Sequence, residues 1–163
     1  VLACHSDTAL ALLGDADERE RKILGSIRYA EQEVVLHCDP ALLPRRRAAW
    51  ASWNVATGGA DDEPIAITYW MNRLQPLPTA TPWCVTLNQT ARIDPARIRT
   101  RLRFAHPQLD LAAIAAQARW HEIDGRRRTH FAGAYWRYGF HEDGAWSGVR
   151  AARALVEARR RAA

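Results

Sequence analysis

Long apolar runs and paired cysteines are both missing from this sequence. No run approaches the roughly 20 apolar residues that a membrane-spanning helix needs. The cysteines are few and widely spaced, at Cys4, Cys38 and Cys84, and no Cys-x-x-Cys pair occurs. Because disulfide frameworks and zinc ribbons need closely patterned cysteines, we expect neither here, and reduced thiols fit a cytoplasmic protein.

Lysine is nearly absent as well, so the positive charge comes from arginine. Lys22 is the only lysine among 23 basic residues, which outnumber 18 acidic ones and give a formal net charge of +5. The arginines form three short runs, at 45–47, 126–128 and 159–161, and acidic residues are interspersed along the chain. Nucleic-acid-binding proteins more often carry one continuous basic stripe. We therefore expect solvated runs and no nucleic-acid partner, with contact to phosphate or lipid headgroups as the alternative.

The remaining composition is that of a folded protein. Hydrophobic residues make up 48% and charged residues 25% of the 163 positions, values that exclude wholesale disorder. The chain starts with the apolar stretch Val1 to Cys4 and without a methionine. We interpret this stretch as the end of a buried strand, and we expect the chain to be the C-terminal part of a longer protein.

The middle of the chain carries the signals of a β-sheet. Residues 48–55 alternate with the period of a strand, and residues 65–74 are rich in β-branched and aromatic side chains. With residues 58–62 as a loop, they predict an antiparallel hairpin. Further strands are expected at 27–29, 34–37, 83–87, 99–104 (before a break at His106-Pro107) and 129–132.

Helices are expected before and after this region. Ser6 is a candidate cap for residues 7–13, and residues 17–24 form a second helical stretch that ends at Gly25. Asp110 is a candidate cap for a helix that ends at Gly125, and one more helix closes the chain. The last two helices each have a predicted apolar face, formed by Leu111, Ile114, Ala115 and Ala118 in one and by Val149, Ala152, Leu155 and Val156 in the other. Together these patterns predict an α+β fold with a mostly antiparallel sheet.

Glycine and aromatic residues are concentrated between Thr129 and Ala154, in a predicted strand–turn–helix. A helix N-terminus carries about half a positive charge and several free backbone N–H groups. Glycines allow a ligand to approach the backbone closely, so the segment suits an anion or a polarised carbonyl. Capping of the helix is the alternative role of Asp143 and Ser147.

This segment resembles the C-terminal flavin signature of the FAD-dependent amine oxidase superfamily. The matching residues are Phe131-Ala132-Gly133, the stretch from Glu142 to Gly148, and Ala151-Ala152. More closely, the chain is similar to a bacterial branch of predicted NAD/FAD-binding, amine-oxidase-like proteins. The segments that carry this similarity are 3–7, 34–37, 49–54, 68–75, 85–88, 106–107 and 139–144.

The resemblance implies an FAD-dependent oxidoreductase that passes hydride from an amine or from an apolar or lipid-linked acyl substrate to flavin. It implies that residues 1–13 cross from a Rossmann-like FAD domain, that residues 14–125 form the substrate domain, and that residues 126–163 close the FAD domain. Contact with the cofactor would come from Gly133, Ala134 and Tyr135 at the pyrophosphate and ribityl chain, and from Phe140, His141, Glu142, Asp143 and Gly144 at the flavin.

Two departures from the family pattern bear on the cofactor. Many members have an acidic residue after the strand glycine, where this chain has Ala134. The Gly-x-Gly-x-x-Gly fingerprint of dinucleotide binding is also missing from these residues, and in the family it lies near the N-terminus. We therefore expect the missing fingerprint segment to belong to the same protein, and residues 1–163 alone to be inactive and to bind FAD weakly or not at all.

Catalytic and substrate residues are less defined. His141, in the loop that would face the flavin, is the candidate base, and a structural role is its alternative. Substrate contact is expected from Trp53, Asn54, Tyr69 and Asn72, although aromatic residues of this kind also pack sheets. No ligand spacing supports a metal site.

Two other functions remain open at this point. The first is a non-catalytic, Arg- and Trp-rich module that binds nucleic acid or an anionic membrane, with peripheral membrane contact. The second is a subunit that completes a site together with another chain.

Overall fold

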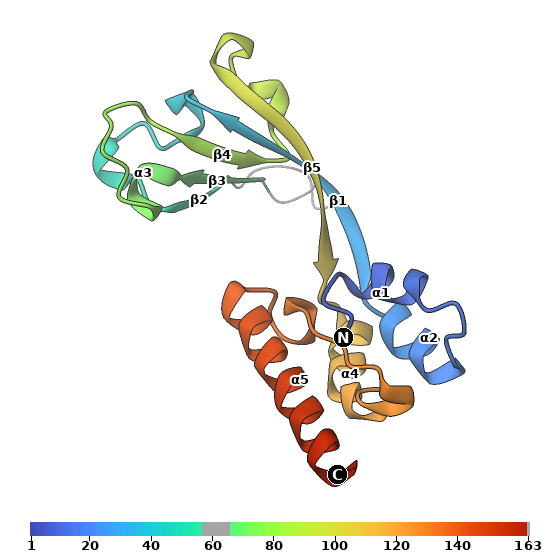
Figure 1. Ribbon diagram of the computed structural model, residues 1–163. Coiled ribbons are helices and arrows are strands. Elements are labelled where there is room, and N and C mark those ends of the chain that lie inside the picture. Colours follow the sequence, from blue (N-terminus) through green and yellow to red (C-terminus); the bar gives the residue numbers. More distant parts are fainter. Residues whose placement is uncertain (57–65, 163) are drawn as a thin grey trace. The chain divides into compact units, whose positions relative to one another are not determined.

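A computed structural model of the protein describes residues 1–56 and 66–162 (Figure 1). Its strands are β1 (Arg28–His37), β2 (Trp53–Ala56), β3 (Ala66–Trp70), β4 (Cys84–Leu87) and β5 (Ile98–Gln108). Its α-helices are α1 (Ser6–Leu12), α2 (Glu18–Gly25), α3 (Met71–Leu74), α4 (Leu111–Ala118) and α5 (His141–Ala162). Within the described ranges, no helix is both long and apolar enough to cross a bilayer.

The chain divides into two compact units. Unit 1 consists of residues 1–30 and 106–163, and unit 2 of residues 31–105. Unit 1 is therefore discontinuous in sequence, since the whole of unit 2 is inserted between its two segments. The boundaries of these units differ from the expected segment boundaries after residues 13 and 125. The assignment of the segments to an FAD domain and a substrate domain stays a prediction.

The five strands form one open sheet in the order β2-β3-β4-β1-β5. Neighbouring strands are antiparallel, with Trp53 opposite Tyr69, Tyr69 opposite Val85, and Val34 opposite Leu87. The α+β class and the antiparallel sheet are thus confirmed. The predicted loop at 58–62 lies outside the described residues.

Several strand boundaries differ from the predicted ones. Residues 28–37 form one continuous strand rather than two. Residues 47–49 form a 3₁₀ turn instead of a strand, and β2 begins only at Trp53. The predicted strand over 65–74 changes to helix α3 after Trp70. The Asn72 side chain explains this change, because it donates to the carbonyls of Thr79 and Thr81 and accepts from the Trp83 N–H.

The expected break at His106-Pro107 was wrong, because β5 continues through it to Gln108. A proline removes one backbone donor, which excludes it from central strands but not from a strand at the edge of a sheet. β5 is such an edge strand. Whether a proline is tolerated within the strand therefore depends on the position of the strand in the sheet. The local sequence does not show that position.

Of the two predicted caps, Asp110 is an N-cap and Ser6 is not. The Asp17 carboxylate accepts from the Glu20 N–H at 2.8 Å and Asp110 accepts from the Ala113 N–H at 2.9 Å, as N-caps do. Ser6 is not a cap but lies inside α1, where its buried hydroxyl donates to the Ile27 carbonyl at 3.5 Å. Helix α4 ends at Ala118, well before Gly125.

The predicted apolar faces of α4 and α5 are largely exposed. Leu111 is 86% and Ile114 is 52% exposed, while the small side chains of Ala113 and Ala116 are buried. In α5, likewise, Ala151 is buried, whereas the larger apolar residues Val149, Leu155 and Val156 are exposed. Small residues allow helices to approach closely, so the structure buries the alanine face instead of the bulkier one.

The core of unit 1 draws on both of its segments, which lie side by side in Figure 1 in blue and in orange to red. Its buried members are Ala9, Ile23, Leu24, Ile27, Ala113, Ala116, Ile123, Phe131, Tyr135 and Trp136. In place of the strands expected at 1–4 and 129–132, one parallel bridge joins Leu2 to Phe131. The Leu2 N–H donates to the His130 carbonyl at 2.8 Å, and the Leu2 carbonyl accepts from the Ala132 N–H at 2.9 Å.

A buried polar chain crosses the sheet of unit 2. The Asp39 N–H donates to His37 Nδ1 at 3.1 Å, so Nε2 carries the proton and donates to Thr86 Oγ1 at 2.8 Å. Thr86 Oγ1 in turn lies 2.9 Å from Thr68 Oγ1. His37 and Thr86 are fully buried. Burial lowers the pKa of His37, against the opposing effect of Asp39, and so keeps the imidazole neutral.

This chain predicts an acid sensitivity that is due to His37. Because the folded pKa is depressed, the stabilising contribution is complete above the ordinary histidine pKa of about 6.5 and is lost as the pH falls below it. Urea unfolding at about pH 7.5 and about pH 5.5 should show a smaller acid loss in His37→Gln than in the wild type. An equal loss in both proteins would contradict this account.

Candidate functional site

The turn before α5 is built around Gly133. The Gly133 N–H donates to the buried Ser147 hydroxyl at 2.9 Å, and that hydroxyl donates to the Gly144 carbonyl at 2.9 Å. A Cβ at Gly133 would lie 2.2 Å from Cε1 of the Tyr135 ring, which is itself buried. A side chain at position 133 would therefore clash with the Tyr135 ring, so glycine is required there. The Gly133 N–H is already hydrogen-bonded to Ser147.

The two aromatic residues that follow Gly133 point into the core rather than to the surface. Tyr135 and Trp136 are 3% and 4% exposed, and their rings lie 4.8 Å apart. The Tyr135 hydroxyl and the Trp136 indole N–H are buried without a hydrogen-bond partner among the described residues. Burial raises the pKa of the Tyr135 hydroxyl, so it stays neutral.

The Asp143 side chain caps the start of α5. Its buried carboxylate accepts from the N–H groups of Tyr138 at 3.2 Å and of Phe140 at 3.0 Å. Arg137 Nε lies 3.6 Å from the same carboxylate. Asp143 thus has the capping role, which the sequence left as the alternative to cofactor contact.

Two backbone donors at this helix start remain unused. The N–H groups of Asp143 and Gly144 both reach the Phe140 carbonyl, but those of His141 and Glu142 have no acceptor among the described residues. Both residues are exposed. Gly139 precedes them with a φ of 89°, a conformation that strains residues with a side chain. The turn therefore presents two N–H groups to the surface at the positive end of a 22-residue helix.

Exposed aromatic side chains accompany these two donors. Tyr138 is 72% and Phe140 is 56% exposed. The surface next to the free N–H groups thus includes two exposed aromatic rings. Such a surface can stack on a planar ring while the N–H groups donate to acceptors at the ring edge.

A ladder of stacked cations and rings holds the start of α5 in place. The Arg137 guanidinium lies 5.0 Å from the centre of the Trp146 ring, and that of Arg150 lies 4.9 Å from Trp146 and 3.7 Å from Trp120. Arg150 Nη2 also donates to the Phe131 carbonyl at 3.4 Å. Sequence reasoning missed this ladder, because its members are up to 30 positions apart and have no common periodicity.

The expected substrate residues lie in unit 2. Trp53 and Tyr69 are brought together as a cross-strand pair, with ring centres 5.2 Å apart, and Trp53 is half exposed. Asn54 and Asn72 are instead engaged with the backbone. The Asn54 amide donates to the carbonyls of Ala51 and Thr68, and Asn72 binds its own loop as described above. Substrate contact by these four residues stays a prediction.

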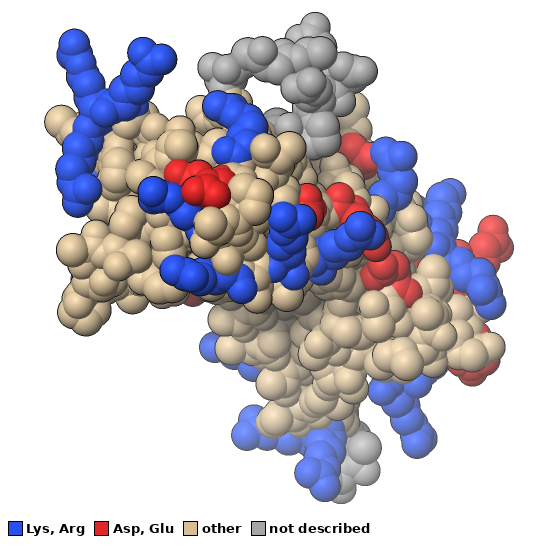
Figure 2. Space-filling model, turned by 90° about the horizontal axis from the view of Figure 1, so that it is seen from above, with Lys and Arg blue, Asp and Glu red and all other residues tan. Residues whose placement is uncertain are grey.

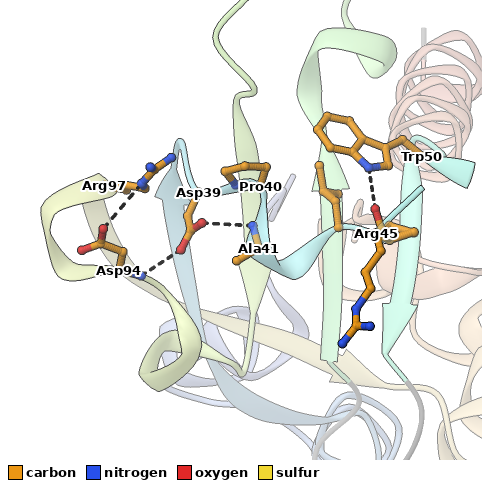
Figure 3. A pocket seen from close by; sticks show the side chains of 9 residues that line it. Asp39, Pro40, Ala41, Arg45, Trp50, Asp94 and Arg97 are labelled. Carbon is orange, nitrogen blue, oxygen red and sulfur yellow. Dashed lines mark hydrogen bonds and ion pairs between the residues drawn. The ribbon is translucent and has the colours of Figure 1, made fainter. Parts of the chain in front are cut away.

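A pocket of about 490 Å³ also lies in unit 2 (Figure 3). Asp39, at its wall, is buried and accepts from the N–H groups of Ala41 at 3.0 Å and Asp94 at 2.9 Å, and these bonds outweigh burial and lower its pKa. The Trp50 indole donates to the Pro44 carbonyl at 2.7 Å on the other side. The Asp39 carboxylate and the Trp50 indole N–H are thus satisfied by the protein itself.

The histidines of the described residues have partners other than a metal ligand set, or lie at the surface. Within the described residues, no group of three or more His, Cys, Asp or Glu side chains is placed to hold an ion. His5 stacks on Tyr29 with ring centres 4.5 Å apart, and His130 Nδ1 lies 3.2 Å from Asp124 Oδ2. His141 is exposed at the helix start and stays the candidate base.

Comparison with known proteins does not assign the chain to a family. No protein-family model matches the chain, and no curated protein matches it in sequence.

The Gly133–Ser147 contact predicts a measurable stability effect. Ser147→Ala should lower the free energy of unfolding by about 1–3 kcal/mol, because it leaves the partly buried Gly133 N–H without its acceptor. Ser26→Ala is the matched control, since its hydroxyl donates to the Lys22 carbonyl at the surface, and should cost about 0.5 kcal/mol or less. Equal effects in urea unfolding would refute the buried contact.

Proposed function

We propose that the turn and helix start at residues 133–144 form part of an FAD site in an oxidoreductase similar to amine oxidases. The observation that carries the proposal is the pair of free N–H groups at His141 and Glu142, next to exposed aromatic surface. The resemblance of the segment to the superfamily's flavin signature supports the same function. The substrate class that we propose is an amine or an apolar or acyl-chain molecule.

The residues present fit the flavin ring better than they fit the rest of the cofactor. Backbone donors at a positive helix end suit the oxygen and nitrogen acceptors on the pyrimidine edge of a flavin. The Gly133 N–H is already used by Ser147, and Ala134 offers no acceptor to ribityl hydroxyls. The dinucleotide portion therefore needs groups from elsewhere, and we propose that a segment with the glycine fingerprint, belonging to the same protein, supplies them.

When bound, FAD would accept two electrons and a proton from the substrate. The contribution of this chain would be electrostatic. The N–H groups of His141 and Glu142 would donate to the pyrimidine edge, where negative charge develops on reduction, and Asp143 would keep the donors aligned by closing the turn. His141 would hold or release a proton at the same turn.

A proline substitution tests the backbone donor directly. His141→Pro removes one free N–H at the first helical position, where proline is tolerated, while His141→Ala removes the side chain and keeps the N–H. In the flavoprotein made from the complete reading frame, His141→Pro should weaken FAD binding about fivefold to tenfold, and His141→Ala should not. Absorption spectroscopy of bound flavin measures both.

Leu111→Pro is the control for proline itself, because it occupies the first position of α4, and Leu111 is exposed. It should leave flavin binding unchanged. A complete reading-frame product that stays colourless after reconstitution with FAD would refute the proposed function. Equal weakening by proline and alanine at position 141 would assign the effect to the imidazole instead of the N–H.

A further inference from the structure

The first half of strand β5 carries an arginine at every second position. Arg99, Arg101 and Arg103 are exposed, and successive side chains of a strand alternate between faces, so these three lie on one face about 6.6 Å apart. No carboxylate of the described residues lies within 4.0 Å of any of them. Arg97 continues the spacing but pairs with Asp94 at 3.5 Å. The predicted arginine runs did not include this set, although its two-residue period was readable in the sequence.

Two of the alternate positions of the same strand, Leu102 and Phe104, are apolar and also exposed. Leu102 is 48% and Phe104 is 49% exposed. Single exposed apolar residues are common and need no explanation. Here, however, two large ones alternate with three unpartnered guanidinium groups over the stretch from Arg99 to Phe104.

The position of β5 at the end of the strand order brings both of its faces to one border of the sheet. β5 is the last strand of the sheet order, and no strand of the described part lies beyond it. A surface that approaches this edge meets the side chains of both faces. The neighbouring strand β1 carries Glu31 and Glu33, and Glu33 accepts from Thr90 Oγ1 at 2.5 Å rather than from an arginine of β5.

We propose that the exposed edge of β5 docks on an anionic lipid bilayer. A bilayer surface offers phosphate groups and an apolar phase within the length of one side chain, and thus matches both sets of residues. Arginine can place its apolar stem along the boundary while its guanidinium stays with the phosphates. A nucleic acid would match the three charges but leave Leu102 without a role. This surface is separate from the proposed flavin site and does not rest on it.

Exposed arginines are not confined to β5, since Arg45, Arg46 and Arg92 are exposed as well. Figure 2 shows Lys and Arg side chains spread over one face of the protein, with acidic side chains between them. Charged residues on an edge strand also protect a sheet against aggregation, which is the competing role for Arg99, Arg101 and Arg103. The experiment must therefore separate lipid binding from protection of the edge.

Vesicle co-sedimentation tests the proposal with two charge-matched variants. The wild type should bind vesicles of phosphatidylcholine with phosphatidylglycerol, bind phosphatidylcholine alone much more weakly, and dissociate as salt is raised. R99Q/R101Q/R103Q should lose about 100-fold in partitioning, since each arginine near an anionic surface contributes about fivefold. The control R45Q/R46Q/R92Q changes three exposed arginines of the same unit and should lose less than about fivefold.

The apolar half of the surface has its own variant. L102S/F104S should weaken partitioning about tenfold without changing the charge. Circular dichroism and size-exclusion chromatography check that each variant folds and stays dispersed.

Three results would overturn the proposal. Equal losses in the two charge-matched variants would indicate unspecific attraction. Binding of a single-stranded oligonucleotide that depends on β5, without vesicle binding, would identify a nucleic-acid surface. Aggregation of R99Q/R101Q/R103Q while the wild type ignores vesicles would identify edge protection.

Discussion

The structure of unit 1 depends on the packing of two chain segments that are separated by the whole of unit 2. Phe131 lies fully buried between them, and its backbone neighbours bond to Leu2. Closing a loop of this length costs conformational entropy, which the shared core must offset. The geometry of the turn at Gly133 and of the start of α5 therefore depends on this core, to which Tyr135 and Trp136 belong.

That core explains why the helix start can present donors to a ligand. Ser147 and Asp143 satisfy the groups on the inner side of the turn, and the Arg137–Trp146–Arg150–Trp120 ladder holds its outer side. The N–H groups of His141 and Glu142 are the donors of this turn that have no acceptor among the described residues. Donors that are fixed before a ligand binds stabilise developing charge without further reorganisation.

The features that the sequence predicted correctly are those with local causes. The cap at Asp110 depends on a residue three positions away, and the strand signals in residues 48–55 and 65–74 predicted the neighbouring antiparallel strands β2 and β3. The wrong predictions concern elements whose conformation or buried face depends on tertiary contacts. Pro107 is tolerated only because β5 is an edge strand, and α4 buries its alanines because small side chains fit the shared core. In the site, sequence reasoning located the turn but could not tell that Gly133 serves the Tyr135 ring, since that contact depends on the fold of the turn.

Residue-resolved amide hydrogen exchange tests most directly whether the core shared by the two segments of unit 1 holds the turn that carries the free N–H groups of His141 and Glu142. We predict that the amides of Leu2, Ala132 and Gly133 exchange slowly and with one common opening free energy, while those of His141 and Glu142 exchange almost unprotected. Fast exchange at Leu2 and Gly133, or strong protection at His141 and Glu142, would contradict the account.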